Sequence, residues 1–313
     1  SITVKKGVRQ GCILSPILFN LYTDYMIEEA FEDLDGVSVN GENLTNIRYA
    51  DDTVLVAESE SKLQLLVKSL NDKCREYGMS LNENKTKVMV LDGSGINENI
   101  NINVQGRILE QVEGYSYLGC WIDRGGKCDK EVRRRIGNAK SVFLNSKEIF
   151  KSSISKNTKK RLIDCYIFPV LTYGCETWTL TKNLIKRIDA LEMWIYRRML
   201  GVTYRDRVTN VEVLSRMDCA LTFVERIAKR KMKYAGHVMR ESSGRLTLNI
   251  LEGHIEGRRR VGRPRRGWMD DIRDWMSQAG NGGIDITYGD IKRSAENREH
   301  WREMVRKVEI LRA

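Results

Sequence analysis

The chain has 313 residues, 41% of them apolar, which is enough for about two domains with real cores and excludes a disordered tail. Lys and Arg number 53 against 42 Asp and Glu, so the net charge is +11 and a polyanionic partner is favoured over an acidic metabolite. Residues 1–100 carry 10 basic and 16 acidic side chains, which leaves 43 and 26, a net +17, for residues 101–313. No apolar run approaches the ~20 residues needed to span a bilayer, so no membrane partner is expected.

The cysteines indicate a reducing compartment. They number seven, form no Cys-x-x-Cys pair and are odd in number, so neither a disulfide framework nor a zinc site is signalled. His237 lies eighteen residues from Cys219 and has no second Cys-His pair to complete a zinc site. We therefore expect an intracellular protein, nuclear and cytoplasmic. Because the text starts at Ser1 without a secretory signal, we expect a fragment or a processed piece of a longer protein.

The first ~120 residues alternate strands and helices. Ser15-Pro16 predicts the start of a helix of about 17 residues, with the serine hydroxyl as its cap. Asn40-Gly41 predicts a hairpin, and Ser59 predicts a second helix that Gly78 closes. Further strands are expected at residues 53–57, 87–91, on both sides of 105–106, and at 115–122.

From about residue 128 the periodicity is helical only. Arg133, Lys140 and Lys147 are seven residues apart and predict a basic stripe on one helix. Thr209-x-x-Glu212 predicts a capping box. The segment Gly257–Gly267 is too charged to pack alone and contains six arginines: Arg258, Arg259, Arg260, Arg263, Arg265 and Arg266. The fold class is therefore α+β, with a mixed first part and an all-helical second part.

Asp51 and Asp52 are the first candidate catalytic residues. They follow Tyr49-Ala50 and precede an apolar strand, and two adjacent carboxylates at a tight turn can offer oxygen ligands to Mg²⁺. Asp is also common in hairpin turns for local hydrogen-bonding reasons, so the pair alone does not decide between a metal site and a turn.

Four motifs in a fixed order give the pair its context. They are GVRQGCILSP from Gly7, YADD from Tyr49, GMSLNENKTK from Gly78 and YLG from Tyr117. Together they resemble the palm blocks of reverse transcriptases of non-LTR (LINE-type) retrotransposons. YGCETW from Tyr173, GHV from Gly236 and RxGRPxxxWxDD from Arg260 resemble the C-terminal half of animal elements of this type. The resemblance covers almost the whole chain.

The resemblance implies roles for named residues. Asp51 would be the principal metal-binding carboxylate, with Asp52 as its partner. Gln10, Gly11 and Tyr49 would contact the incoming nucleotide or the template, and Lys85 or Lys87 would lie near the triphosphate. Tyr117, Leu118 and Gly119 would form the primer grip.

The implied chemistry is RNA-templated addition of deoxynucleotides to a DNA 3′ end with two Mg²⁺ ions. Its partners would be an RNA template, a DNA primer or target DNA, and deoxynucleoside triphosphates. The implied fold is a partial right-hand polymerase palm at residues 1–125, built as an antiparallel sheet with helices. An α-helical thumb would follow at 126–205 and a basic helical extension at 206–313.

The chain departs from the family pattern at its start. The first palm block, with the third metal-binding aspartate, and the fingers lie upstream of the segment that Ser1 begins. An upstream endonuclease region is also expected in the parent polyprotein. Asp24 is the only early carboxylate that could substitute, but it lies within the predicted Ser15 helix, where a solvated helix residue is expected. We therefore expect this chain alone to be inactive.

The basic segments and the aromatic motif allow two interpretations each. Arg133, Lys140, Lys147 and the six arginines would neutralise phosphates of nucleic acid, or the arginine run would be a solvated linker. Gly262-Arg263-Pro264 resembles the core of an AT-hook, although Val261 replaces the expected arginine. The stretch from Tyr173 to Trp178 would stack on bases or, as we expect, pack in the core.

Two other classes remain open at this point. One is a nucleic-acid-binding remnant of such an element in which the catalytic site no longer acts. The other is a group II intron maturase, which shares the palm blocks, although the segments at Tyr173 and Arg260 favour the retrotransposon.

Overall fold

The computed structural model describes residues 7–91, 99–242, 244–253, 265–279 and 286–308. The predicted phosphate-binding residues Arg258, Arg259, Arg260 and Arg263 lie outside these ranges. The chain divides into two compact units, the first comprising 1–126 with 249–258 and the second 127–248 with 259–313. Helix α10 (Arg245–Glu252) crosses this division.

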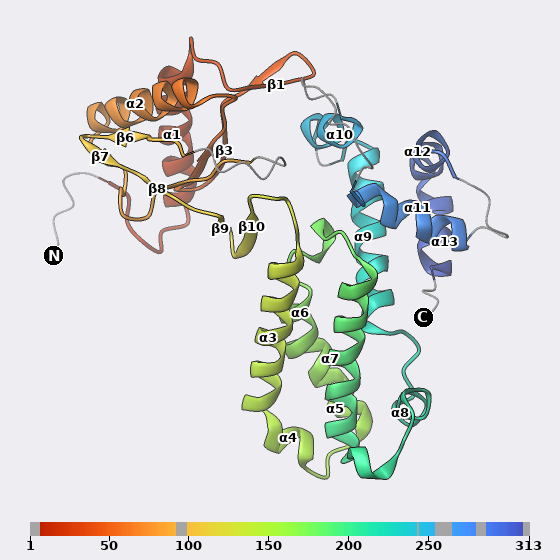
Figure 1. Ribbon diagram of the computed structural model, residues 1–313. Helices are drawn as coiled ribbons and strands as arrows, with labels where there is room; N and C mark the ends of the chain where they lie inside the picture. Colours follow the sequence, from red (N-terminus) through yellow and green to blue (C-terminus); the bar gives the residue numbers. More distant parts are fainter. Residues whose placement is uncertain (1–6, 92–98, 243, 254–264, 280–285, 309–313) are drawn as a thin grey trace. The chain divides into compact units, whose positions relative to one another are not determined.

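The first unit has its core between two helices, α1 (Ser15–Phe31) and α2 (Glu60–Glu76) (Figure 1). Ile27 and Phe31 of α1 pack with Leu66 and Leu70 of α2. Both helices begin and run where the sequence predicts. The predicted cap of α1 is wrong, however, because the Ser15 hydroxyl donates to the Arg9 carbonyl, at 2.7 Å, and caps no N–H of the helix.

The strands of the first unit confirm the α+β class at a coarse level. Its described strands are β1 (Val37–Val39), β2 (Glu42–Leu44), β3 (Asn46–Tyr49), β4 (Asp52–Leu55), β5 (Lys87–Val88), β6 (Asn103–Val104), β7 (Arg107–Ile108), β8 (Glu110–Gln111), β9 (Gly114–Tyr117) and β10 (Cys120–Asp123). They pair as four antiparallel hairpins and one parallel pair, β5–β8, within the described residues. The antiparallel sheet expected of a palm is thus present only as separate pairs, since strands of two to four residues offer few backbone groups for further pairing.

Turn residues explain these hairpins. Asn40 and Gly41 both have positive φ, 53° and 79°, as the two-residue turn between β1 and β2 requires. Gln105 and Gly106 do the same between β6 and β7, with φ of 53° and 86°. Both predicted hairpins are confirmed.

The outer face of α1 is apolar and exposed. Leu14, Ile17, Leu18 and Leu21 are each more than half exposed, while Met26 and Ile27 of the same segment are buried. A helix that is apolar on opposite faces is typical of one that packs between two layers of protein.

The second unit consists of helices throughout its described part. Its bounds are α3 (Asp129–Asn145), α4 (Lys147–Lys151), α5 (Lys156–Leu162), α6 (Phe168–Leu171), α7 (Lys182–Leu200), α8 (Asn210–Met217), α9 (Phe223–Met239), α11 (Trp268–Ala279), α12 (Tyr288–Glu296) and α13 (Arg298–Lys307). A π-helical turn at Ile163–Ile167 joins α5 to α6 just before Pro169. Short 3₁₀ turns lie at Cys175–Thr177 and Tyr204–Asp206.

Helix α9 is the centre of this unit (Figure 1). It packs against α7 on one side and against α11, α12 and α13 on the other, while α3 packs on α6 and α7. Phe223 of α9 contacts Phe168 and Tyr196 edge-on, with ring centroids 5.4 and 5.9 Å apart. These buried contacts join α6, α7 and α9 into one core.

Candidate active site

The two candidate catalytic aspartates lie in an exposed turn. Strands β3 and β4 pair from Asn46 and Leu55 to Tyr49 and Asp52, so Ala50 and Asp51 form the two-residue turn. Both carboxylates are exposed. Ala50 has φ of 54°, a left-handed conformation that costs an L-residue about 1–2 kcal/mol. The turn holds this strain at the point where it presents both carboxylates.

An ion pair ties this turn to α1. The Arg48 guanidinium lies 2.8 Å from the Asp24 carboxylate. The Asp24 carboxylate is therefore paired with Arg48, and this ion pair links the β3–β4 hairpin to the helix. Asp24 is 53% exposed on α1, so the prediction of a solvated helix residue is confirmed, and the fold adds a β3 arginine as its partner.

The predicted primer grip lies near the aspartate turn. Leu118 and Gly119, with φ of 46° and 74°, form the turn between β9 and β10. The Tyr117 hydroxyl is buried without a hydrogen-bond partner, and burial, with a further contribution from the negative charge of Asp52, raises the pKa of this phenol. Tyr117 is therefore neutral at physiological pH and within electrostatic reach of Asp52, so the structure brings these two predicted site residues together.

The predicted template and nucleotide contacts are exposed. Gln10 and Gly11 lie in the turn before α1, where Gly11 has φ of 84° and the Cys12 N–H donates to the Arg9 carbonyl at 3.2 Å. Tyr49 is 66% exposed beside the aspartate turn. Within the described residues no hydrogen bond or ion pair joins Gln10 to either aspartate.

The two candidate triphosphate lysines differ in their partners. Lys87 forms an ion pair with Glu110 across the parallel β5–β8 pair, with Nζ 2.6 Å from the carboxylate. Lys85 is exposed, and its backbone N–H donates to Asn82. Lys85 is thus the ammonium of the two that is available to an added phosphate.

A cysteine in the Gln10 turn provides a first test. The Cys12 thiol is exposed, and hydrogen bonds from the Leu14 backbone and the Ser15 side chain lower its pKa. Burial raises the pKa of Cys175 to about 12, and that side chain is 0% exposed. In brief iodoacetamide labelling near pH 7.5, we expect Cys12 to react early and Cys175 to be protected, because the thiolate is the nucleophile. Peptide mass spectrometry measures the labelling of both cysteines in the native chain and in urea. Equal labelling is expected only in urea, so equal labelling in the native chain would contradict the fold around them.

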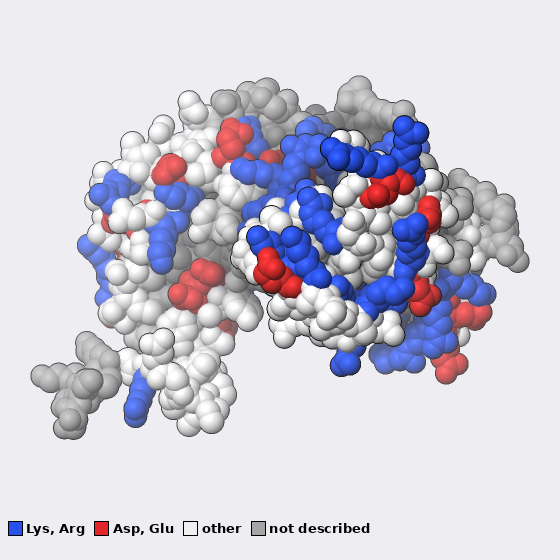
Figure 2. All heavy atoms as spheres, turned by 90° about the horizontal axis from the view of Figure 1, so that it is seen from below, with Lys and Arg blue, Asp and Glu red and all other residues white. Residues whose placement is uncertain are grey.

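The predicted basic stripe lies in the second unit but not on one helix. Arg133 and Lys140 belong to α3, whereas α3 ends at Asn145 and Lys147 begins α4. The predicted stripe is therefore broken at Lys147, because a seven-residue spacing cannot follow one helix across the break at Ser146. Figure 2 shows Lys and Arg side chains gathered over the second unit with fewer acidic ones between them.

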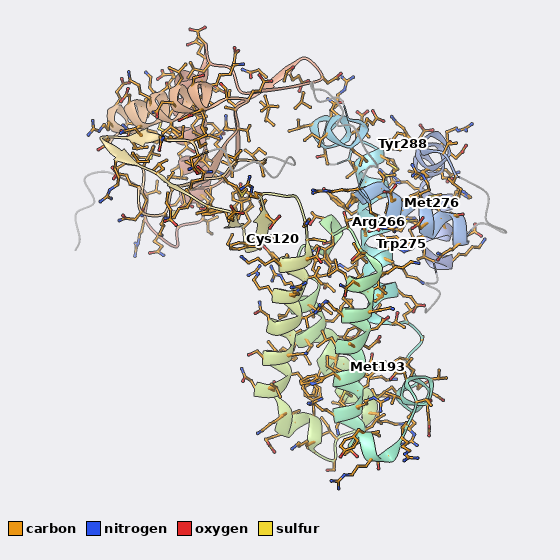
Figure 3. The ribbon with its side chains drawn as sticks, in the orientation of Figure 1. Cys120, Met193, Arg266, Trp275, Met276 and Tyr288 are labelled. Carbon is orange, nitrogen blue, oxygen red and sulfur yellow. The ribbon has the colours of Figure 1, made fainter. Side chains whose placement is uncertain are left out.

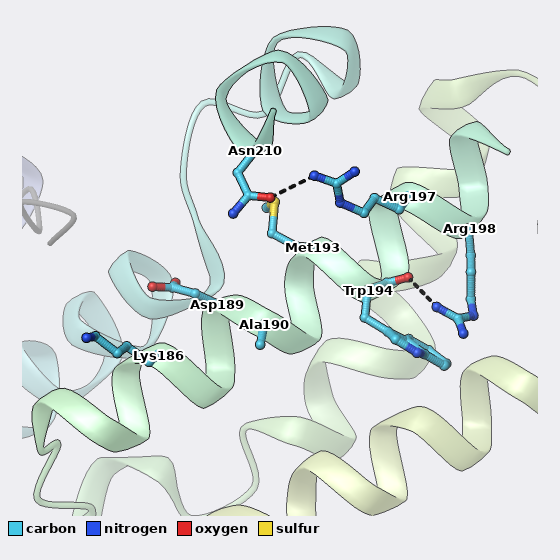
Figure 4. Close-up of a pocket in the computed structure, with 8 residues that line it drawn as sticks. All are labelled: Lys186, Asp189, Ala190, Met193, Trp194, Arg197, Arg198 and Asn210. Carbon is cyan, nitrogen blue, oxygen red and sulfur yellow. Dashed lines mark hydrogen bonds between the residues drawn. The ribbon is translucent and has the colours of Figure 1, made fainter. Parts of the chain in front are cut away.

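A groove that the sequence does not reveal lies beside α7 (Figure 4). Its volume is about 610 Å³, and it is lined by Lys186, Asp189, Ala190, Met193, Trp194, Arg197, Arg198 and Asn210. The Arg198 guanidinium lies 3.8 Å from the centroid of the Trp194 ring, and Lys140 of α3 lies over the same ring at 5.5 Å. The i,i+4 spacing of Trp194 and Arg198 was the only available signal.

Two distant motifs and helix α9 meet at one buried ion pair. Lys231 of α9 and Asp271 of α11 are both fully buried and bonded to each other, and Lys231 also donates to the Trp178 carbonyl at 2.7 Å. Asp271 accepts from the Leu180 N–H at 2.8 Å and from Arg266 Nε at 2.9 Å. Arg266, Trp275 and Met276 lie around α11 in Figure 3.

This junction assigns roles to motif residues. Trp178 is 1% exposed and Cys175 is 0% exposed, so core packing of that segment, as predicted, is confirmed for them. Tyr173 is half exposed, with the Arg135 guanidinium 4.5 Å from its ring centroid. Arg266 forms ion pairs with Asp271 and Asp274, so its surroundings do not fit the predicted role as a phosphate contact.

Two features are absent from the described residues: a membrane-spanning helix and a cluster of metal-binding side chains. No helix there is both long and apolar enough to cross a membrane. No group of three or more His, Cys, Asp or Glu side chains there could hold a metal ion. Among the described residues the aspartate turn therefore offers two carboxylates without a third metal-binding side chain, so Mg²⁺ held there would need further oxygen ligands, such as substrate phosphates.

An exposed aspartate pair on a hairpin and a strongly basic helical part are compatible with a nucleic-acid polymerase, and the comparisons with known proteins define the class. The family described as reverse transcriptase (RNA-dependent DNA polymerase) matches residues 1–122. A transposon-derived protein of Caenorhabditis elegans is 33% identical over 280 residues, which cover 86% of this chain and 98% of the relative.

Longer relatives point the same way. A Pol polyprotein from the R2 retrotransposable element of Popillia japonica is 23% identical over 61% of this chain, and the RNA-directed DNA polymerase of the jockey element of Drosophila funebris is 22% identical over 67%. The chain belongs to the reverse transcriptase family of non-LTR retrotransposons. Its matches span about a third of the R2 polyprotein and about a quarter of the jockey polymerase.

Proposed function

We propose that the first unit is part of the palm of an RNA-directed DNA polymerase and that Asp51 and Asp52 are its metal ligands. The observation that carries the proposal is the strained, exposed turn that presents both carboxylates, with Asp52 within electrostatic reach of Tyr117. When bound there, Mg²⁺ supplies activation of the primer hydroxyl and neutralisation of the pyrophosphate charge.

The other site residues serve substrate placement in this proposal. Lys85 holds the triphosphate, since Lys87 is paired with Glu110. Gln10 and Gly11 offer an exposed turn in which the missing side chain of Gly11 allows a base or sugar to approach the backbone. Tyr117, Leu118 and Gly119 orient the primer end, with the exposed Leu118-Gly119 turn as the contact and the Tyr117 side chain, whose hydroxyl is buried, as its support.

We assign the remaining parts by the same proposal. Residues 1–125 are palm, 126–205 are a helical thumb and 206–313 are a basic extension. Arg133 and Lys140, with Lys147 beyond the end of α3, then contact the phosphates of the template and primer. The apolar outer face of α1 packs against additional polymerase sequence, of the kind that the longer relatives carry.

A nucleic-acid-binding protein without polymerase activity is the second candidate. The observation that favours it is the charge division, with the +17 net charge confined to residues 101–313 and only two carboxylates at the aspartate turn. Such a protein would bind nucleic acid through its second unit and would gain no activity from added polymerase sequence.

Primer extension separates the two candidates. On a primed RNA template with Mg²⁺ or Mn²⁺, the 313-residue chain alone is expected to give no extension, because two carboxylates leave the metal site incomplete. The same chain joined behind the upstream region of the jockey polymerase is expected to extend the primer. A joined chain that binds the primed template but never extends it would support the second candidate, and robust extension by the 313 residues alone would refute the incomplete site.

A further inference from the structure

Helix α13 is fixed along α9 by one tryptophan. The Trp301 indole is 2% exposed, and its Nε1–H donates to the Met232 carbonyl at 2.9 Å. Gly236 of α9 permits this approach, because a Cβ there would lie 2.4 Å from Trp301 Nε1. The outer surface of α13 therefore has a defined place on α9.

Cations line the seam of these two helices. Arg298, Arg302 and Arg306 are exposed and recur every four residues, about 6 Å apart along α13. Lys229 of α9 donates to the Arg306 carbonyl at 2.9 Å, and Arg240 of α9 donates to the Ala295 carbonyl at 2.6 Å. We call these five residues the α9–α13 ridge.

The ridge has acidic charge nearby, since the positive charge of Arg306 helps to lower the pKa of Glu303, but within the described residues it has no ion pair of its own. No carboxylate of the described residues forms an ion pair with any of its five members, whereas Glu303 on the neighbouring flank of α13 is paired with Lys307. Arg240 Nε is buried with no hydrogen-bond partner. Burial and the nearby charges of Arg298 and Arg302 lower the pKa of Arg240. Exposed arginines such as Arg298 and Arg302, which crowd a third guanidinium, are the surroundings that an anion stabilises.

We propose that the α9–α13 ridge binds the phosphate backbone of a double-stranded nucleic acid. Cations about 6 Å apart on a straight helix can each meet a phosphate, and a duplex offers one charge per about 1.7 Å of its axis. Trp301 is buried, so the ridge has no exposed aromatic ring on which a base could stack. Backbone contacts of this kind carry no sequence information, so binding is indifferent to base sequence.

The ridge residues are different from the proposed thumb residues Arg133, Lys140 and Lys147, and the sequence motifs do not include them. The inference rests on the proposed function in one respect, namely that the protein acts on nucleic acid. Binding is measured without nucleotides or metal, so a failed polymerase assay and a failed ridge assay remain separate results.

The test compares two triple variants of the full chain. The first is Arg298→Gln/Arg302→Gln/Arg306→Gln. The matched control is Arg216→Gln/Arg273→Gln/Arg293→Gln, which removes the same charge from helix surfaces where each arginine is paired with a carboxylate three or four residues away. Fluorescence anisotropy with a labelled duplex DNA of mixed sequence gives the affinity across a salt series, and circular dichroism confirms that both variants fold.

In the ridge variant, the slope of log affinity against log salt is expected to flatten by about 2–3, at about 0.9 per lost phosphate contact. Affinity near 0.1 M salt falls on the order of 10- to 100-fold. The control is expected to change the slope by less than about 1, because its arginines are already neutralised. Replacing the three ridge arginines by lysine should keep the slope, since counterion release depends on charge.

Three results would overturn the proposal. Equal losses in the ridge variant and the control would mean that net charge alone governs binding. An unchanged slope in the ridge variant would show that the ridge arginines do not contact phosphates. Tighter binding of a single strand than of the duplex of equal length would reject the double-stranded partner.

Discussion

Asp271→Asn is expected to destabilise the second unit by about 3–5 kcal/mol, because it removes the carboxylate that is paired with the buried ammonium of Lys231. The ammonium would retain the Trp178 carbonyl and two tryptophan rings, whose centroids lie 4.9 and 5.5 Å away. These contacts do not replace a charge partner for a fully buried ammonium. Urea unfolding followed by tryptophan fluorescence measures the loss.

The pH dependence of this variant has a definite sign. Burial lowers the pKa of Lys231, and Asp271 opposes that shift. Without Asp271 the pKa of Lys231 in the folded chain falls further below its unfolded value, so the unfolded state binds more protons between the two values. The stability deficit of Asp271→Asn is therefore greatest near neutral pH and shrinks as the pH rises toward that of free lysine, about 10.4.

Two further variants control this experiment. Asp164→Asn makes the same change in a half-exposed pair with Arg226, 2.6 Å apart, and is expected to cost at most about 1 kcal/mol. Lys231→Met combined with Asp271→Asn should cost less than the sum of the two single changes, by about 0.5–3 kcal/mol. Strict additivity, or a loss in Asp271→Asn no larger than in Asp164→Asn, would show that the pair contributes nothing beyond packing.

Local features of the first unit were predictable from its sequence. The turns at Asn40-Gly41 and Gln105-Gly106 are confirmed because each requires a backbone conformation that only a few residue types favour. The helix from Ser15 is confirmed because its start and its apolar spacing are contained within 17 residues. The shape of the sheet was not predictable, because pairing between short strands depends on segments far apart in the chain, such as β5 and β8.

The second unit shows the complementary limit. A lysine in a basic helix and one of two adjacent aspartates give no sign of burial, yet Lys231 and Asp271 lie at the centre of the unit while Asp270 pairs with Arg273 at its surface. The charge of the sequence likewise predicts phosphate contacts for the arginine run, whereas Arg266 forms ion pairs with carboxylates of the protein. The packing of α11 and α13 on α9 shows which cations are paired with carboxylates and which belong to the α9–α13 ridge, and the sequence does not.

The aspartate turn carries the prediction with the largest effect on activity. In the chain joined to the upstream jockey region, Asp51→Asn is expected to reduce primer extension by at least about 10³-fold, since metal ligation supplies several kcal/mol of transition-state stabilisation. The change keeps the size of the side chain, and Asp51 is exposed in the turn, so folding should be unaffected. Single-turnover extension at saturating nucleotide measures the chemical step.

Asp24→Asn is the matched control for Asp51→Asn. It makes the same substitution in the same unit, but Asp24 is 2.8 Å from Arg48 and outside the turn, so its effect on extension should stay within a few-fold. Mn²⁺ binding, followed by electron paramagnetic resonance, should weaken in Asp51→Asn and not in Asp24→Asn, because the proposal makes Asp51 a ligand whereas Asp24 is paired with Arg48. Extension at the unsubstituted rate in Asp51→Asn would refute the metal assignment, whereas equal losses in both variants would make Asp24 a third ligand and Arg48 its competitor.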